Sequence, residues 1–242
     1  MSKGDLLLAI DTSTTVVTVA IGSADRVLAT RSVPTERRHA EVLAPTIREA
    51  VSDAAIELHV LAAIATGLGP GLFTGLRVGV TTAKAMAQAL GIPTVGLSTL
   101  DVLAASADAD RVVAVLDAGR REVFWAHYEQ AERTSDDRVG PARELRRELV
   151  TPVTLVGDGA AVAAAELTGP GVTISHVVAP DPGLLLEMGA VAWARGDARD
   201  PAALVPRYVR RADAEIQSTF EGPVTETVTE ASNVGGAMGE ER

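Results

Sequence analysis

The chain has 242 residues, of which 47% are hydrophobic, and a formal net charge of −10 at pH 7. This length allows one large domain or two small ones, and the apolar content is enough for a buried core. The acidic balance argues against a broad basic surface that would hold nucleic acid unaided. The sequence has no cysteine, which excludes a disulfide scaffold, thiolate metal ligands and a cysteine nucleophile.

The sequence also lacks the usual targeting features. It starts Met1-Ser2-Lys3-Gly4-Asp5, which does not resemble a signal peptide. No apolar run approaches the roughly 20 residues that span a bilayer. We therefore expect a cytoplasmic protein without membrane association.

The first half of the chain reads as alternating strands and helices of an α/β protein. A continuous apolar run ends in Asp11, as in a strand buried on both faces. Glycines and helical apolar spacing mark the other elements. We expect strands over 6–11, 16–21, 26–33 and 61–66, a helix from about 40 to 54, a glycine-rich loop over 67–71 and a helix from 75 to about 89.

The second half repeats this order in shorter form. A strand over 111–117 again ends in Asp, a strand over 122–128 returns, and a strand over 153–156 runs into Gly157-Asp158-Gly159. Either the fold is duplicated, or common α/β elements coincide. We expect an N-terminal lobe over 1–107, a smaller C-terminal lobe over 108–215 and a disordered acidic tail over 216–242.

The glycine-rich loop and the start of the following helix are candidates for anion binding. Gly69 and Gly71 allow a sharp strand-to-helix turn, and Thr74 is a suitable N-cap. Arg77 falls in the first helical turn, where the helix dipole disfavours a cation, which suggests an anionic partner. The loop could hold a phosphate, or it could be only a tight turn.

The turn after the first strand is a second candidate. Asp11, Thr12 and Ser13 could place a carboxylate and hydroxyls around a phosphate and its Mg²⁺. A hydrogen-bonded β-turn is the equally supported alternative, because these residue types are common turn formers.

One face of the helix after the loop carries no bulky side chain. Its residues recur every fourth position: Gly75, Gly79, Ala83 and Ala87. Such a stripe lets another segment approach closely. It either packs on the protein's own sheet or contacts a helix of a second chain.

Motifs for chemistry within this chain are missing. There is no Gly-Lys-Ser/Thr phosphate loop and no Gly-x-Ser-x-Gly elbow, and the four histidines are scattered. We therefore predict neither catalytic residues nor a metal site.

Several segments together resemble the bacterial TsaB (YeaZ) family over roughly residues 6–211. Gly-Pro-Gly-x-Phe-Thr-Gly-x-Arg-x-Gly is the most specific of them. The matching segments are Leu8–Ser13, Arg38–Glu41, Gly67–Gly79, Ser98–Leu100, Leu116–Ala118 with Glu122–Ala126, Gly157–Gly159 and Pro206–Arg210.

This resemblance implies an actin-like (ASKHA) fold of two related lobes, each with a mixed β-sheet and flanking helices, the second shortened. It also implies a non-catalytic subunit that activates a TsaD-like catalytic paralogue and works with a TsaE-like ATPase. The complex transfers a threonylcarbamoyl group to N6 of the adenosine 3′ of the anticodon in tRNA. No cofactor is expected on the isolated chain, but ATP or ADP with Mg²⁺ could bind at the complex interface.

The resemblance also suggests where partners bind. Family members pair through their early helices, which points to Arg38, His39 and Val42 and to the small-residue stripe. A homodimer through the same helices is possible when the partner is absent. TsaD holds its metal with a His-x-x-x-His pair, whereas this chain has His39 and Leu43, so one ligand is missing.

Two other functions remain as alternatives. A metal-dependent glycoprotease-like endopeptidase would need a bound metal, which the missing histidine disfavours. A stand-alone ASKHA ATPase or phosphotransferase would need a second phosphate loop, for which Gly157-Asp158-Gly159 is the one candidate.

Overall fold

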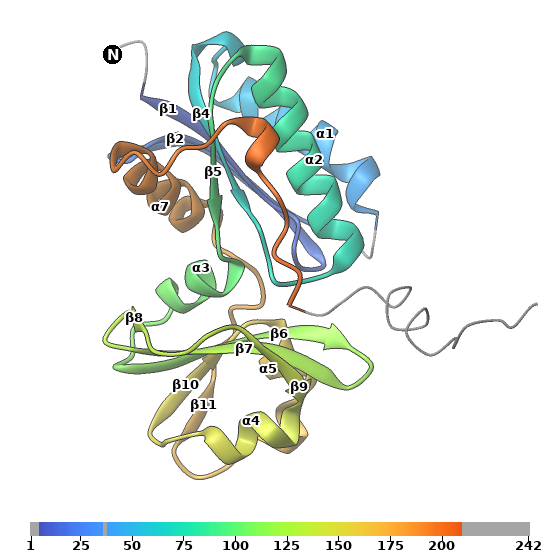
Figure 1. Ribbon diagram of the computed structural model, residues 1–242, viewed down its shortest axis with the longest axis vertical. Helices are drawn as coiled ribbons and strands as arrows, with labels where there is room; N and C mark the ends of the chain where they lie inside the picture. Colours follow the sequence, from blue (N-terminus) through green and yellow to red (C-terminus); the bar gives the residue numbers. More distant parts are fainter. Residues whose placement is uncertain (1–4, 36–37, 210–242) are drawn as a thin grey trace, which may run out of the picture. The chain divides into compact units, whose positions relative to one another are not determined.

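The computed structural model describes residues 5–35 and 38–209 (Figure 1). In this range the chain forms two β-sheets, each covered by helices on both faces. The described helices are too short or too polar to cross a membrane.

The first sheet has the strand order β3-β2-β1-β4-β5. β2 runs antiparallel to β1 and β3, while β4 and β5 run parallel to β1. Leu8 and Ile10 of β1 face one core, and Leu7 faces the other, so both faces of the sheet are buried as its apolar run predicts. The strands are β1 (Leu6–Asp11), β2 (Val16–Ser23), β3 (Arg26–Pro34), β4 (Leu61–Gly67) and β5 (Thr94–Leu97).

Three longer helices cover this sheet. α1 (His39–Asp53) and α2 (Phe73–Leu90) lie on one face, and α7 (Pro182–Ala194) lies on the other (Figure 1). The short helices η1 (Leu58–Val60) and η2 (Pro201–Ala203) lie in the connections.

The second sheet repeats the arrangement of the first. Its order is β11-β10-β6-β7-β8, with β9 also paired to β7. β6 pairs antiparallel with β7 and parallel with β10, as β1 does with β2 and β4. The strands are β6 (Arg111–Gly119), β7 (Glu122–Glu129), β8 (Glu132–Arg133), β9 (Arg138–Pro141), β10 (Val153–Val156) and β11 (Val172–Ile174). The predicted actin-like fold of two related lobes is therefore confirmed.

Shorter helices complete the second lobe: α4 (Ala142–Glu148), α5 (Asp158–Val162) and α6 (Ala164–Leu167). α3 (Thr99–Ala105) joins the lobes. Its Val102 packs in a core of the first sheet, whereas Leu100 and Leu103 pack in a core of the second. The two sheets thus share this one helix.

The expected second lobe, 108–215, is too long. Leu185 and Leu186 of α7 pack against Leu7 of the first sheet, so the chain returns to the first lobe after β11. The reason is that this face of the first sheet carries an apolar cluster, including Leu7, Ala9 and Ala20, which needs a covering helix. Residues 210–215 and the expected tail, 216–242, lie outside the described residues.

The small-residue stripe of α2 faces the protein's own sheet. Ala83 and Ala87 are fully buried in the core with β1 and β4. A Cβ on Gly75 would lie 2.1 Å from the carbonyl oxygen of Thr12, and one on Gly79 would lie 2.2 Å from its Oγ1. The interpretation of this stripe as a partner surface is therefore wrong, because no space remains for a second chain.

Replacing Gly79 with leucine should destabilise the protein. The new side chain must displace Thr12, which by overpacking lowers the free energy of unfolding by about 1–3 kcal/mol. The exposed Ala85 on the same helix provides the control, since Ala85→Leu should change stability by no more than about 0.5 kcal/mol. Urea unfolding of both variants tests this, and equal stabilities would contradict it.

Candidate functional site

The carboxylate of Asp11 is enclosed by the chain's own groups. Its side chain is fully buried. Oδ1 accepts hydrogen bonds from the backbone N and Oγ of Ser13, at 2.7 and 2.5 Å, and Oδ2 accepts one from Thr99 Oγ1 at 3.1 Å. Burial raises the pKa of Asp11, although these hydrogen bonds oppose the shift. A Cβ on Gly67 would lie 1.8 Å from Oδ2, so this glycine leaves the space that the carboxylate occupies.

The glycine-rich loop closes against the turn between β1 and β2. The N–H of Leu72 donates to the carbonyl of Ser13 at 2.7 Å, and Thr12 Oγ1 donates to the carbonyl of Gly75 at 2.7 Å. A Cβ on Gly71 would lie 2.3 Å from the Ser13 carbonyl oxygen. The two anion-binding candidates are thus brought together, which the sequence analysis did not predict, and their polar groups bond to each other. In this structure they form a tight strand-to-helix turn.

The start of α2 differs from the expected one. The helix begins at Phe73, and Leu72, at its N-cap, makes no side-chain capping bond. Thr74 lies inside the first turn and is exposed, so its assignment as N-cap is wrong. The hydrogen bond from the Leu72 N–H to the Ser13 carbonyl holds the chain just before Phe73, so the helix begins there and not after Thr74. Gly69 turns the loop with a φ of +96°.

Arg77 lies in an exposed cluster with two aromatic residues, which we call the aromatic–arginine cluster. Its guanidinium carbon is 3.9 Å from the ring centroid of Phe73, and its Nε donates to Tyr208 Oη at 3.1 Å. The ring centroids of Phe73 and Tyr208 are 5.2 Å apart. Both aromatic side chains remain more than two-fifths exposed, which is unusual for residues of this type.

Sequence reasoning found Arg77 but not its partners. Tyr208 is 131 positions away, so spacing alone gives no link between them. The available signal was Tyr208's place in the family-like segment Pro206–Arg210.

His39 is not on the surface. It is 2% exposed, and its Nε2 lies 2.7 Å from the carbonyl oxygen of Thr14. This histidine therefore supports the β1–β2 turn, and its assignment to a partner surface is wrong. Arg38 is exposed before α1, and Val42 is half-buried. Among the described residues, no group of three or more histidines and carboxylates is arranged to hold a metal ion.

The second lobe has a counterpart of the β1–β2 turn around Asp11. Asp117 of β6 corresponds to Asp11 of β1, and its backbone N–H donates to Asp158 Oδ1 at 2.9 Å. Burial, helped by the charge of Asp117, raises the pKa of Asp158 to about 6. A Cβ on Gly159 would lie 2.5 Å from the carbonyl carbon of Leu116, so this loop is closely packed too.

Comparison with known proteins identifies the family. A family model for TsaD, tRNA N6-adenosine threonylcarbamoyltransferase, matches residues 32–166. The solved structure of YeaZ from Pseudomonas aeruginosa is 31% identical, with a TM-score of 0.75 over 85% of this chain and 100% of that chain. The chain belongs to the TsaB (YeaZ) family. TsaB of Bacillus subtilis is 29% identical over 227 residues, covering 87% of this chain and 96% of that protein. An uncharacterized Mycobacterium tuberculosis protein is 41% identical over 211 residues, covering 86% and 93%.

The raised pKa of Asp158 predicts a pH effect on stability. The folded protein binds this proton more tightly than the unfolded chain, whose aspartate pKa is near 3.8. The stabilisation is present below about pH 4 and is lost as the pH rises through about 6.

Asp158→Asn should therefore gain stability relative to the parent protein between about pH 4 and pH 7, as measured by urea unfolding at several pH values. Asp25→Asn, in the exposed turn between β2 and β3, is the control. The same pH profile in the parent and Asp158→Asn would contradict the prediction.

Proposed function

We propose that this chain is a non-catalytic subunit in the biosynthesis of N6-threonylcarbamoyladenosine in tRNA, and that it binds and activates a TsaD-like catalytic paralogue. Several TsaB relatives are described as tRNA threonylcarbamoyladenosine biosynthesis proteins. The observation that best supports a non-catalytic role is the closed turn around Asp11, whose polar groups already form hydrogen bonds within the chain. A subunit with this turn contributes binding surface rather than chemistry.

The partner surface is the outward side of α1 and α2, which lie next to each other (Figure 1). Since the small-residue stripe is buried, the contacts must come from the opposite side of α2. Arg38 remains a candidate at the start of α1. Other exposed residues of the two helices include Glu41, Arg48 and Glu49 of α1, and Phe73, Thr74, Arg77, Thr81, Ala85 and Gln88 of α2.

The aromatic–arginine cluster is the strongest anchor on this surface. Arginine and aromatic residues dominate the binding energy of protein interfaces when partners bury them. Arg77 is held by Phe73 and Tyr208, so little side-chain entropy is lost on binding. Its guanidinium would meet a carboxylate or phosphate of the assembled complex.

The remaining components follow from this role. A TsaE-like ATPase would complete the complex, and tRNA would bind through the complex because this chain carries a net charge of −10. ATP or ADP with Mg²⁺ would bind at the joint interface. Without its partner the chain could pair with itself through α1 and α2, and the assembly would work in the cytoplasm.

Arg77→Ala should weaken binding to the TsaD-like paralogue by about 10-fold while leaving the fold intact, because a desolvated arginine contact is lost. Affinity is measured by titration calorimetry. Arg195→Ala, after α7 on the other side of the first sheet, should bind normally. If Arg77→Ala binds the paralogue with unchanged affinity, the aromatic–arginine cluster is not part of the interface.

A reconstitution assay tests the proposed role itself. Threonylcarbamoyl transfer to tRNA is followed with the TsaD-like and TsaE-like proteins and the enzyme that makes the threonylcarbamoyl-adenylate, with and without this chain. We expect product only when the chain is present. Equal product without it would refute the activating role, and an ATP titration of the isolated chain would then test independent activity.

A further inference from the structure

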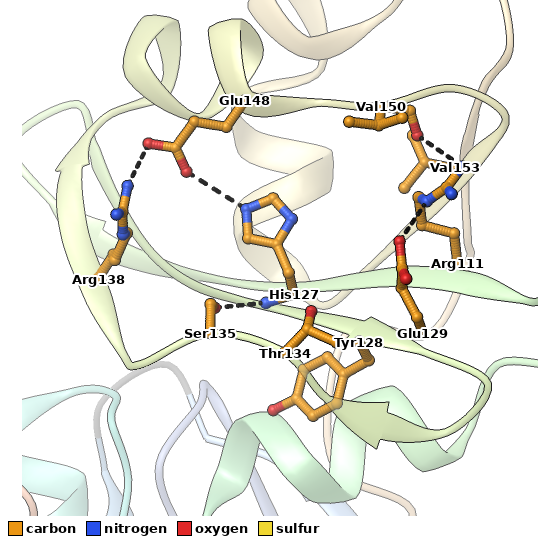
Figure 2. A pocket seen from close by; sticks show the side chains of 10 residues that line it. All are labelled: Arg111, His127, Tyr128, Glu129, Thr134, Ser135, Arg138, Glu148, Val150 and Val153. Atoms are coloured by element: carbon orange, nitrogen blue, oxygen red, sulfur yellow. Dashed lines mark hydrogen bonds and ion pairs between the residues drawn. The ribbon is translucent and has the colours of Figure 1, made fainter.

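An open cavity of about 360 Å³, with both charged and apolar lining residues, lies in the second lobe (Figure 2). Side chains from β6, β7, the β8–β9 segment and the end of α4 line it. None of these residues belongs to the glycine-rich loop or to the outward side of α1 and α2. The cavity is therefore a separate feature of the molecule.

Two ion pairs stand on opposite sides of His127 in this cavity (Figure 2). Arg111 Nε lies 3.0 Å from Glu129 Oε1 on one side. Arg138 Nη1 lies 2.5 Å from Glu148 Oε1 on the other. The walls thus carry two positive and two negative side chains, and a ligand with a single charge would meet attraction and repulsion together.

In the pair formed by Arg138 and Glu148, the carboxylate of Glu148 is held by further contacts. Glu148 Oε2 also accepts a hydrogen bond from Trp125 Nε1 at 3.2 Å and lies 3.3 Å from His127 Nε2. This carboxylate is therefore fully engaged. Figure 2 shows the second ring nitrogen of His127 turned toward the side of Arg111, where it can contact a ligand.

The pair formed by Arg111 and Glu129 has fewer and longer contacts to the rest of the protein, so its side chains can move. The side chain of Glu129 is 56% exposed and that of Arg111 is 32% exposed. Within residues 5–35 and 38–209, the other contacts of Arg111 are long ones of 3.4 Å to the carbonyls of Val150 and Pro152. A partly exposed ion pair contributes little to stability. Arg111 and Glu129 can therefore separate and each contact a ligand instead, at a small cost in free energy.

We propose that this cavity binds a small zwitterion of amino-acid or dipeptide size. Its carboxylate would lie on the guanidinium of Arg111, and its ammonium group on the carboxylate of Glu129. Val150 and Val153 border the same side and would contact an aliphatic side chain. The opposite charges of the wall match those of the ligand, so each charged end of the zwitterion would meet a side chain of the opposite sign.

Titration of the full-length chain, followed by calorimetry and amide NMR shifts, tests this proposal. The probes are L-alanine and L-alanyl-L-alanine, which distinguish the two ligand sizes, with acetate and ethylammonium as single-charge fragments. We expect one of the zwitterions to bind saturably and at least about 10-fold more tightly than either fragment. Shifts should appear at His127 and Glu129.

Two variants locate the contacts. Arg111→Gln and Glu129→Gln should each weaken zwitterion binding by about 10-fold or more. Arg31→Gln removes the ion pairs with Glu49 and Asp53 on the first lobe and should bind normally. If Arg111→Gln fails to fold, the affinity of Glu129→Gln for the zwitterion alone tests the proposed contacts.

Two outcomes would overturn the proposal: no saturation by either zwitterion up to ~10 mM, or unchanged binding by Glu129→Gln. Neither depends on the proposed partner role, because the assay contains this chain alone.

Discussion

The position of α2 depends on one close contact, between Thr12 and the two glycines of the helix. The hydroxyl of Thr12 bonds to the Gly75 carbonyl, and neither Gly75 nor Gly79 has room for a Cβ. Because the helix can approach β1 this closely, the glycine-rich loop closes over Asp11. The same approach sets the first turn of α2 and so brings Arg77 to the surface beside Tyr208. One threonine thereby links the buried turn to the exposed cluster.

Much of the fold could be predicted because its signals are local. β1 and β6 are buried on both faces, so each reads as an unbroken apolar run that ends in Asp, and the repeated order of elements gives two lobes. The sequence did not predict which of the two sheets α7 covers. Its apolar sequence fits either sheet, and only three-dimensional packing places Leu185 on the first.

The candidate site was predicted less well, because it depends on distant contacts. The stripe of Gly75 and Gly79 has the same spacing whether it faces a sheet or a second chain, and only the position of Thr12 decides. Thr74 looked like an N-cap until the Ser13 carbonyl fixed Leu72. The cavity beside His127 joins strands whose charged residues show no motif in the sequence.

The segment from η2 to Arg207 runs along α2 and contacts both lobes. Lys84 Nζ donates to the carbonyls of Ala202 and Leu204, each at 3.1 Å, and the N–H of Arg207 donates to Leu68 at 2.8 Å. Arg207 also pairs with Asp137 of the second lobe at 2.9 Å. A recombinant form shortened to end before this segment, or fused to another protein there, would lose an anchor of both lobes together with half of the exposed aromatic pair. A form that keeps residues 200–208 retains all of these contacts.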